Sequence, residues 1–139
     1  MKEAYCSEKV SEMLKKKGFD EPCVAFWEYG LYEYSLYIIG YPMTNSDLEK
    51  ELLDGWSAPT HQMAMAWLRE KHNIFLGVGF GADNRGDFLF MADIYDLTND
   101  AIGGRYVPIV EADEYLTKNP KSPEEAIEEA LKYVLENLI

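Results

Sequence analysis

The sequence predicts an α+β domain in which one antiparallel sheet of two hairpins carries three main helices packed mainly on one face, with a fifth edge strand left open. Apolar residues recur at helical spacing in residues 2–17, 57–73 and 122–138, whereas residues 74–80 alternate with a period of two. Polar turn formers in residues 83–86 separate this strand from a second strand-like segment. The chain is long enough to bury its own core, so a single domain over residues 1–139 is expected.

The central helix and the strand after it set the orientation of the predicted sheet. Either Ser57 or Thr60 caps the helix, and Asn73 ends it because asparagine tolerates the left-handed conformation. The strand points alternate side chains inward and outward. The inward set is Ile74, Leu76, Val78 and Phe80, and the outward set is Phe75, Gly77, Gly79 and Gly81. Glycine repeated on one face indicates that something bulky approaches the backbone there, either another part of the chain or a partner.

The first half of the chain is predicted to form a helix, a hairpin and a short helix. The helix over residues 2–17 ends at Gly18, and strands over residues 23–29 and 31–41 turn near Gly30. In the second strand the inward set is Tyr32, Tyr34, Leu36 and Ile38, and the outward, wetter set includes Tyr37, Ile39 and Tyr41. The capping-box spacing of Ser46-Asp47-Leu48-Glu49 predicts a short helix over residues 47–53.

The second half is predicted to complete the sheet and add the last helix. A return strand over residues 87–97 places Leu89, Met91, Asp93 and Tyr95 on its outward face. Residues 105–110 are a candidate edge strand, blunted by Pro108. Ser122-Pro123-Glu124-Glu125 is typical of a helix start, because it combines a capping residue, a proline and acidic side chains.

The charge balance restricts the class of partner. The chain has 13 Lys and Arg against 25 Asp and Glu, which gives a net charge of −12. This charge repels the phosphate backbone of nucleic acids and the headgroups of anionic membranes, so direct binding to either is disfavoured. The hydrophobic content of 47% excludes an intrinsically disordered chain.

The cysteine usage and the apolar runs predict a cytoplasmic protein. Cys6 and Cys23 are expected to be small core residues in a reducing compartment rather than a disulfide. The first residues carry acids where a signal peptide would be apolar, and no apolar run approaches the ~20 residues needed to cross a bilayer.

No motif predicts a catalytic residue, a cofactor or a metal ion. Residues 77–82 satisfy the glycine-rich dinucleotide fingerprint, but a turn and a strand follow where that fingerprint requires a helix. His61 and His72 lie about 16 Å apart along the predicted helix, too far to share one metal ion, and each is expected to mark a helix end. The chain is therefore expected not to be an enzyme, and a hydrolase that uses His61 or His72 is the least supported alternative.

Several short stretches resemble a family of small proteins from bacterial phages and mobile elements. The strongest are Ala58-Pro59-Thr60-His61-Gln62, Ala66-Trp67-Leu68-Arg69-Glu70 and His72-Asn73-Ile74, and Gly18-Phe19, Cys23 and residues 125–131 are similar too. The acidic residues 47–54 and the glycine-rich strand differ from the usual pattern. Because that family has no assigned activity, the resemblance implies a prophage-type accessory role and supplies no functional residues.

The outward face of the predicted sheet is the candidate interaction face. It carries Tyr37, Ile39, Tyr41, Phe75, Gly77, Gly79, Leu89, Met91 and Tyr95. Such a face is more apolar than a monomer usually exposes, and it is rich in residues favoured at interfaces. The leading hypothesis is a non-enzymatic protein that forms a homodimer or docks a protein partner, unless residues 98–121 fold over this face. The alternative is an acidic mimic of DNA that inhibits a nucleic-acid-binding enzyme.

Overall fold

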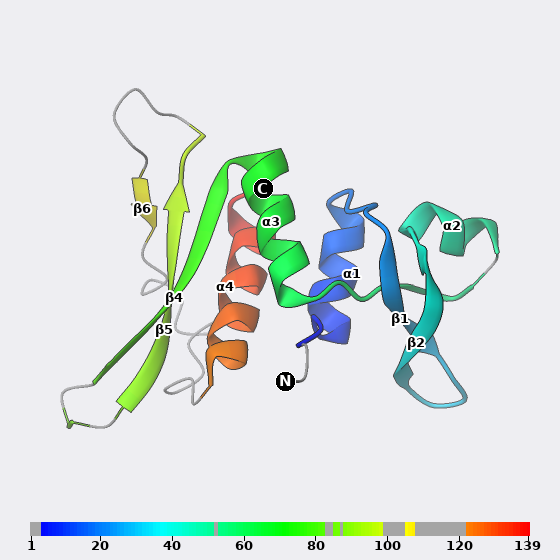
Figure 1. The fold of residues 1–139 in the computed structure, drawn as a ribbon, viewed down its shortest axis with the longest axis horizontal. Helices are drawn as coiled ribbons and strands as arrows, with labels where there is room; N and C mark the ends of the chain where they lie inside the picture. Colours follow the sequence, from blue (N-terminus) through cyan, green and yellow to red (C-terminus); the bar gives the residue numbers. More distant parts are fainter. Residues whose placement is uncertain (1–3, 52, 83–84, 87, 99–104, 108–121) are drawn as a thin grey trace. The chain divides into compact units, whose positions relative to one another are not determined.

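The structure is a computed structural model, and it describes residues 4–51, 53–82, 85–86, 88–98, 105–107 and 122–139. The elements follow the order α1 (Glu8–Lys16), β1 (Cys23–Tyr29), β2 (Tyr34–Met43), α2 (Asn45–Lys50), β3 (Gly55–Ser57), α3 (His61–His72), β4 (Ile74–Ala82), β5 (Phe88–Asp96), β6 (Arg105–Val107) and α4 (Pro123–Asn137) (Figure 1). The α+β class is confirmed. The described strands form two antiparallel sheets, with the orders β2-β1-β3 and β4-β5-β6, in place of the predicted single sheet.

The chain divides into two compact units, residues 1–64 and residues 65–139. The boundary falls inside α3, and each unit contains one of the two sheets. The predicted single domain over residues 1–139 stays a prediction. Within the predicted second hairpin, Asp83, Asn84 and Asp87 lie outside the described residues, as do residues 99–104 and 108–121 of the weakly patterned segment.

The first unit packs one helix against each face of its sheet (Figure 1). On one face the indole N–H groups of Trp27 and Trp56 donate to the carbonyl oxygens of Cys6 and Glu8, each at 3.0 Å, at the start of α1. On the other face Phe26, Met43 and Leu48 of α2 form a buried cluster, against which Ile39 and Leu53 pack. Ile39 was predicted on the wetter side of β2 and instead contributes to this core, whereas Ile38, predicted inward, is 67% exposed. Tyr37 and Tyr41 are exposed, as predicted for the outward side, so the predicted direction is wrong only in part. Neither side of β2 is uniformly buried, because a helix covers each face of the sheet.

The strand β3 is an element that the sequence did not predict. It pairs with β1 at Phe26, Trp27 and Glu28, and a Cβ atom on Gly55 would overlap the carbonyl oxygen of Trp27. Only glycine therefore allows the two backbones to approach this closely.

A buried amide holds β3 in place. The Asn45 side chain is 4% exposed, accepts a hydrogen bond from the Ser57 amide at 2.8 Å and donates to the Phe19 carbonyl at 2.7 Å. This one side chain connects the start of α2, the loop after α1 and the third strand.

Several of the predicted helix ends are confirmed, but α1 begins at Glu8, capped by Ser7, and the described residues 4–7 that were predicted to belong to it are not helical. The Thr60 hydroxyl accepts from the Met63 amide at 3.2 Å, which identifies Thr60 rather than Ser57 as the cap of α3. Asn73 follows this helix with a φ of 54°, as expected of a left-handed stop. Ser122 caps α4 through the Glu125 amide, as predicted.

The helix α2 begins two residues earlier than predicted. Its cap is Thr44, whose hydroxyl accepts from the Asp47 amide at 3.0 Å, while the Asp47 carboxylate accepts from the Thr44 amide at 2.9 Å. The amide N–H of Thr44 lowers the pKa of Asp47 below its usual value because it stabilises the ionised carboxylate. The alternative cap, Ser46, instead donates its hydroxyl to Asp20 at 2.6 Å.

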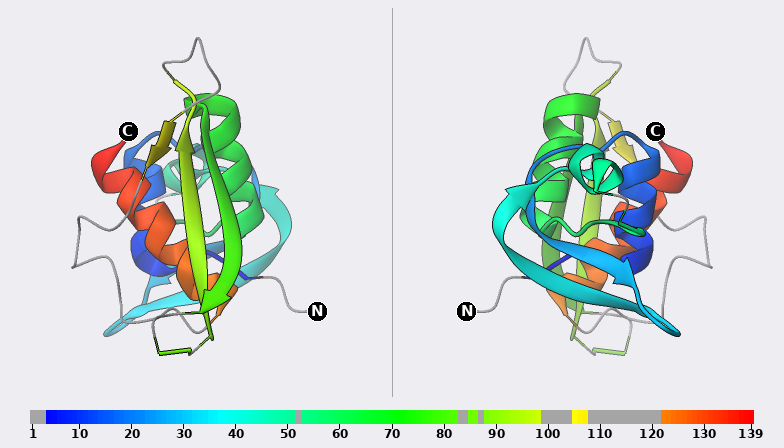
Figure 2. Two further views of the ribbon diagram at one scale, coloured as in Figure 1. Left: turned by 90° about the vertical axis from the view of Figure 1, so that its left-hand side faces the viewer. Right: turned by 90° about the vertical axis from the view of Figure 1, so that its right-hand side faces the viewer.

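The second unit is a long hairpin with α4 on one face. The strands β4 and β5 pair in register from Ile74↔Asp96 to Ala82↔Phe88, and β6 pairs with the outer edge of β5 at its C-terminal end, around Tyr95. The predicted edge strand is therefore confirmed over residues 105–107. The helix contacts both long strands, and the left view of Figure 2 looks onto the hairpin with α4 behind it. The buried side chains of this layer are Ile74, Leu76, Ile94, Ala126, Ala130, Leu131, Val134 and Leu135.

The predicted inward face of β4 is correct only for its first half. Ile74 and Leu76 are buried, but Val78 is 39% exposed and Phe80 is 63% exposed. The hairpin is about 30 Å long, whereas α4 spans about 22 Å, and the far half of the hairpin extends away from the helix (Figure 1). Phe80 instead lies against Phe90, with 5.6 Å between the ring centroids.

Replacing Asn45 with alanine is expected to lower the free energy of unfolding of the first unit by about 1–3 kcal/mol, because the Ser57 amide and the Phe19 carbonyl would lose their buried partner. Urea unfolding followed by tryptophan fluorescence measures this change. Ser46→Ala is the matched control, since its hydroxyl is exposed, and a change within about 0.5 kcal/mol is expected. Equal stability of the two variants would contradict the role assigned to Asn45.

Candidate functional site

The predicted interaction face is divided between the two sheets. Tyr37, Ile39 and Tyr41 belong to β2 in the first unit, whereas the other six residues belong to β4 and β5 in the second. Within β2 the Tyr37 ring stacks on Phe26 with 5.7 Å between centroids, and Ile39 packs into the core. The single predicted face is thus corrected to two separate surfaces, because the chain forms two sheets.

The structure does bring the β4 and β5 members of the predicted face together. Phe75 pairs with Tyr95 and Gly79 pairs with Met91, and their apolar side chains are 43%, 39% and 49% exposed for Phe75, Tyr95 and Met91 respectively. Gly77 pairs with Asp93, which lies between them on the same face. We call this surface the glycine face; its members are Phe75, Gly77, Gly79, Met91, Asp93 and Tyr95. Leu89 pairs with Gly81 through the backbone, and its side chain lies outside the description.

No described helix covers the glycine face of the second unit. A Cβ atom on Gly77 would contact only the Phe75 ring, at 3.8 Å. A Cβ atom on Gly79 would contact only the Asp93 carboxylate and the Met91 carbonyl oxygen, each at 3.9 Å. These are ordinary van der Waals distances, and every contacting atom belongs to the hairpin itself. Among the described residues of this unit, the strip of bare backbone is therefore open.

The charge of the glycine face comes from Asp93. The strand β4 carries no side chain that is charged at neutral pH, and in β5 the acidic and basic side chains are Asp93 and Asp96 alone. Asp96 accepts hydrogen bonds from the amide and the hydroxyl of Thr98. Asp93 was predicted on the outward face of the strand but was not among the predicted site residues. An acid alternating with apolar side chains on a glycine-rich hairpin is the signal that would have identified it.

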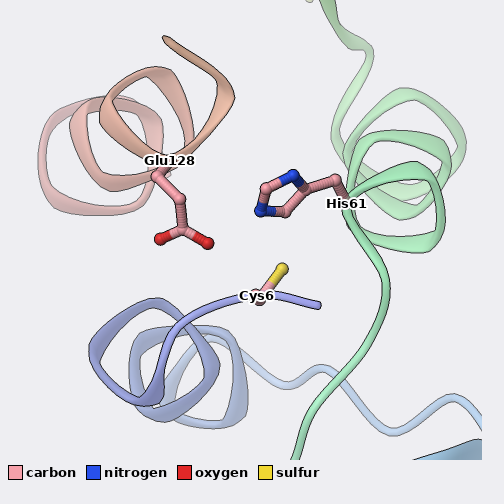
Figure 3. Close-up of side chains that lie close together, drawn as sticks. All are labelled: Cys6, His61 and Glu128. Carbon is pink, nitrogen blue, oxygen red and sulfur yellow. The ribbon is translucent and has the colours of Figure 1, made fainter. Parts of the chain in front are cut away.

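Cys6 and His61 lie together in the first unit, which the sequence could not predict. The Cys6 Sγ and a ring nitrogen of His61 are within 4.8 Å of each other, and Figure 3 shows the two side chains pointing toward one another. The backbone hydrogen bonds that join them run from the Cys6 amide to the Pro59 carbonyl and from the His61 amide to the Ala4 carbonyl. Glu128, also drawn in Figure 3, belongs to α4 of the second unit.

A thiol next to an imidazole is the arrangement of a cysteine nucleophile and its base, but burial argues for a structural role here. Cys6 is 0% exposed and His61 is 5% exposed. The Cys6 thiol lies 4.0 Å from the carbonyl oxygen of Thr60, and its own carbonyl accepts from Trp27 and Ser11. Cys6 is thus fixed where the N-terminal segment meets the start of α3. His72, by contrast, ends α3 and packs edge-on against Trp67.

Cys23 is unsuited to nucleophilic chemistry. Burial raises the pKa of its thiol from 9.0 to about 12, the Ser57 hydroxyl opposes the rise, and the Glu21 carboxylate adds to it. The thiol donates to the Glu21 carbonyl at 3.5 Å, and Cys23 forms no disulfide with Cys6. Because the thiolate is the reactive form of cysteine, this side chain is inert near neutral pH.

Comparison with known proteins yields no relative from which a function could be transferred: no family model, curated protein or solved structure matches the chain. The resemblance to proteins of phages and mobile elements therefore stays a prediction. In the part of the chain that the structure describes, no helix is both long and apolar enough to span a membrane.

The raised pKa of Cys23 is expected to make stability depend on alkaline pH. The buried neutral thiol contributes stability that is fully present below pH 9.0 and is lost as the pH rises toward 12. Urea unfolding of the wild type and of Cys23→Ala between pH 8 and 11 measures this contribution as the difference between the two proteins. A difference that stays constant with pH would contradict the assignment.

Proposed function

We propose that the protein is a non-enzymatic interaction protein that binds a basic surface of another protein through the glycine face. The observation that carries the proposal is the open strip at Gly77 and Gly79, where hairpin atoms are the only ones among the described residues that would contact an added Cβ atom. Bare backbone allows a partner chain to approach more closely than a strand with side chains would. Phe75, Met91 and Tyr95 flank the strip and are of types enriched at interfaces.

The charge supports a basic partner. The chain has a net charge of −12, and β4 and β5 contain no basic residue. An arginine of the partner could pair with the Asp93 carboxylate while its guanidinium stacks on the Phe75 or Tyr95 ring. A second copy of this chain fits the glycine face less well, because it would bring two Asp93 carboxylates together.

The biological setting belongs to the same proposal. An accessory role of the prophage type, as the resemblance implies, requires binding and no catalytic centre. A cytoplasmic location agrees with Cys6 and Cys23, which form no disulfide.

Threonine at Gly79 is expected to stabilise the second unit while it blocks the glycine face. A β-branched side chain suits a strand better than glycine, so the free energy of unfolding should rise by about 0.5–1 kcal/mol. The 3.9 Å contacts leave room for the new Cβ atom. Thermal unfolding of Gly79→Thr measures this effect. A loss of stability would mean that another part of the chain covers the strip, and the proposed binding surface would not exist.

Peptide display tests the binding itself. A random peptide library selected against the wild type, with Gly79→Thr as the counter-selection target, is expected to yield peptides that combine Arg or Lys with apolar residues. Val78→Thr is the matched control, because Val78 is exposed on the opposite face of the same strand. Asp93→Asn should lower the affinity for the selected peptides and reduce the salt dependence of their binding.

Two outcomes would overturn the proposal. The first is a selection that yields no peptide sensitive to Gly79→Thr. The second is a set of basic peptides that bind wild type and Gly79→Thr equally and dissociate in salt, which would favour the acidic DNA mimic instead.

A further inference from the structure

The second exposed surface is the free edge of β2. In the sheet order β2-β1-β3, β2 is an outer strand, and among the described residues it pairs with β1 alone. It is ten residues long, and none of its residues is Asp, Glu, Lys, Arg or His. Its exposed side chains are mostly large and apolar: Leu36, Tyr37, Ile38 and Tyr41 are 36%, 47%, 67% and 61% exposed.

Natural proteins protect such an edge, and β2 lacks the usual protection. Lysine side chains, an inward-pointing charge or a proline in the middle of the strand would prevent pairing with another chain. In β2 the sole proline is Pro42, near its end, and residues 34–38 pair with β1 in one register before the ladder shifts between Ile38 and Met43. Residues 34–38 therefore stay competent to pair. A long, uncharged, apolar edge strand is a docking site for a further strand.

The hydrogen-bond pattern of the sheet shows which groups this edge offers. Ala58 donates its amide N–H to the Ala25 carbonyl at 2.9 Å, and Tyr29 donates to Asp54 at 3.0 Å, so Ala25 and Tyr29 of β1 turn their backbone groups toward the β3 side. Successive residues alternate, so the backbone groups of Phe26 and Glu28 point toward β2. There these two residues pair with Tyr37 and Ser35.

As a consequence, the backbone groups of the alternate residues in β2 point away from β1. The N–H and C=O groups of Leu36 and Ile38 point to the free edge, because successive residues of a strand turn these groups to opposite sides. No described strand pairs with this edge, so these groups can bond a strand that lies alongside.

The lack of charged residues in β2 indicates which kind of chain pairs with its free edge. The chain carries 25 acidic residues, and a protein partner attracted by that charge would favour an acidic surface. Two copies of this chain repel each other except where they can meet through an uncharged segment, and β2 is a ten-residue segment of that kind. Antiparallel pairing of identical strands is also self-complementary about a two-fold axis.

We infer that two copies of the chain associate by antiparallel pairing of β2 with β2, centred on Tyr37. In this register Leu36 of one copy forms hydrogen-bonded pairs with Ile38 of the other, and the two Tyr37 residues face each other as a non-hydrogen-bonded pair. The six strands form one continuous sheet. The inference goes beyond the proposed function, because it uses the first unit and leaves the glycine face unoccupied.

Light scattering after size-exclusion chromatography, over a range of protein concentrations, tests the association. The wild type is expected to convert from monomer to dimer, and Ile38→Lys is expected to raise the dissociation constant at least about tenfold, because it places a charge against the apolar Leu36 pair. Val24→Lys is the matched control: Val24 is 42% exposed but lies on the central strand, so its dimer should persist. Gly79→Thr should also leave the dimer intact, which separates this test from that of the proposed function.

Disulfide trapping tests the register. Mild oxidation of Tyr37→Cys is expected to join two copies, because paired residues at a non-hydrogen-bonded position bring the Cα atoms within disulfide range. Ile38→Cys is the control, since its neighbour across the pair is Leu36, and it should be trapped more slowly.

Three outcomes would overturn the inference. They are a wild type that stays monomeric at all concentrations, a dimer that Ile38→Lys leaves unchanged, and equal trapping of the two cysteine variants. A monomer whose β2 edge binds display-selected peptides would identify another chain as the occupant.

Discussion

The arrangement of the first unit depends on the buried amide of Asn45. A three-residue strand such as β3 makes few ladder hydrogen bonds, so it needs a further interaction to hold its position. The Asn45 side chain provides one through Ser57, while its bond to Phe19 fixes the loop that leads from α1 into β1. With β3 held on one side of β1, β2 becomes the opposite outer strand, and both faces of the sheet are covered by helices. The exposed edge therefore follows from a polar contact on the far side of the sheet.

Local chemistry predicted the ends of elements well. Ser122, Thr60 and Asn73 act within one turn of their own position, so their signals are complete in the sequence. The cap of α2 was assigned to Ser46 rather than Thr44 because both offer a hydroxyl at a suitable spacing. The tertiary contact of Ser46 with Asp20 decides between them, and that contact is not local.

Sheet membership could not be predicted in the same way. The alternation of apolar residues with a period of two indicates which residues share a face. It does not indicate which strands pair or how much of a face a helix covers. Ile39 and Ile38 exchanged their expected environments for this reason, and Phe80 extends beyond the reach of α4. The predicted members of the candidate face between Phe75 and Tyr95 do lie on one face, because they belong to a single hairpin. Two strands joined by a short connection fix their own register. The Cys6 and His61 contact depends on the N-terminal segment meeting the start of α3, for which the sequence holds no local signal.

The short length of β3 limits how far an assembly built on this sheet can grow. Once the long outer strand is occupied, the remaining border consists of Gly55–Ser57, which both α1 and α2 contact. Three residues offer too little backbone to template another chain. Edge-to-edge assembly through this sheet therefore stops at the dimer. The protein can expose a strand that pairs with another copy without polymerising into filaments.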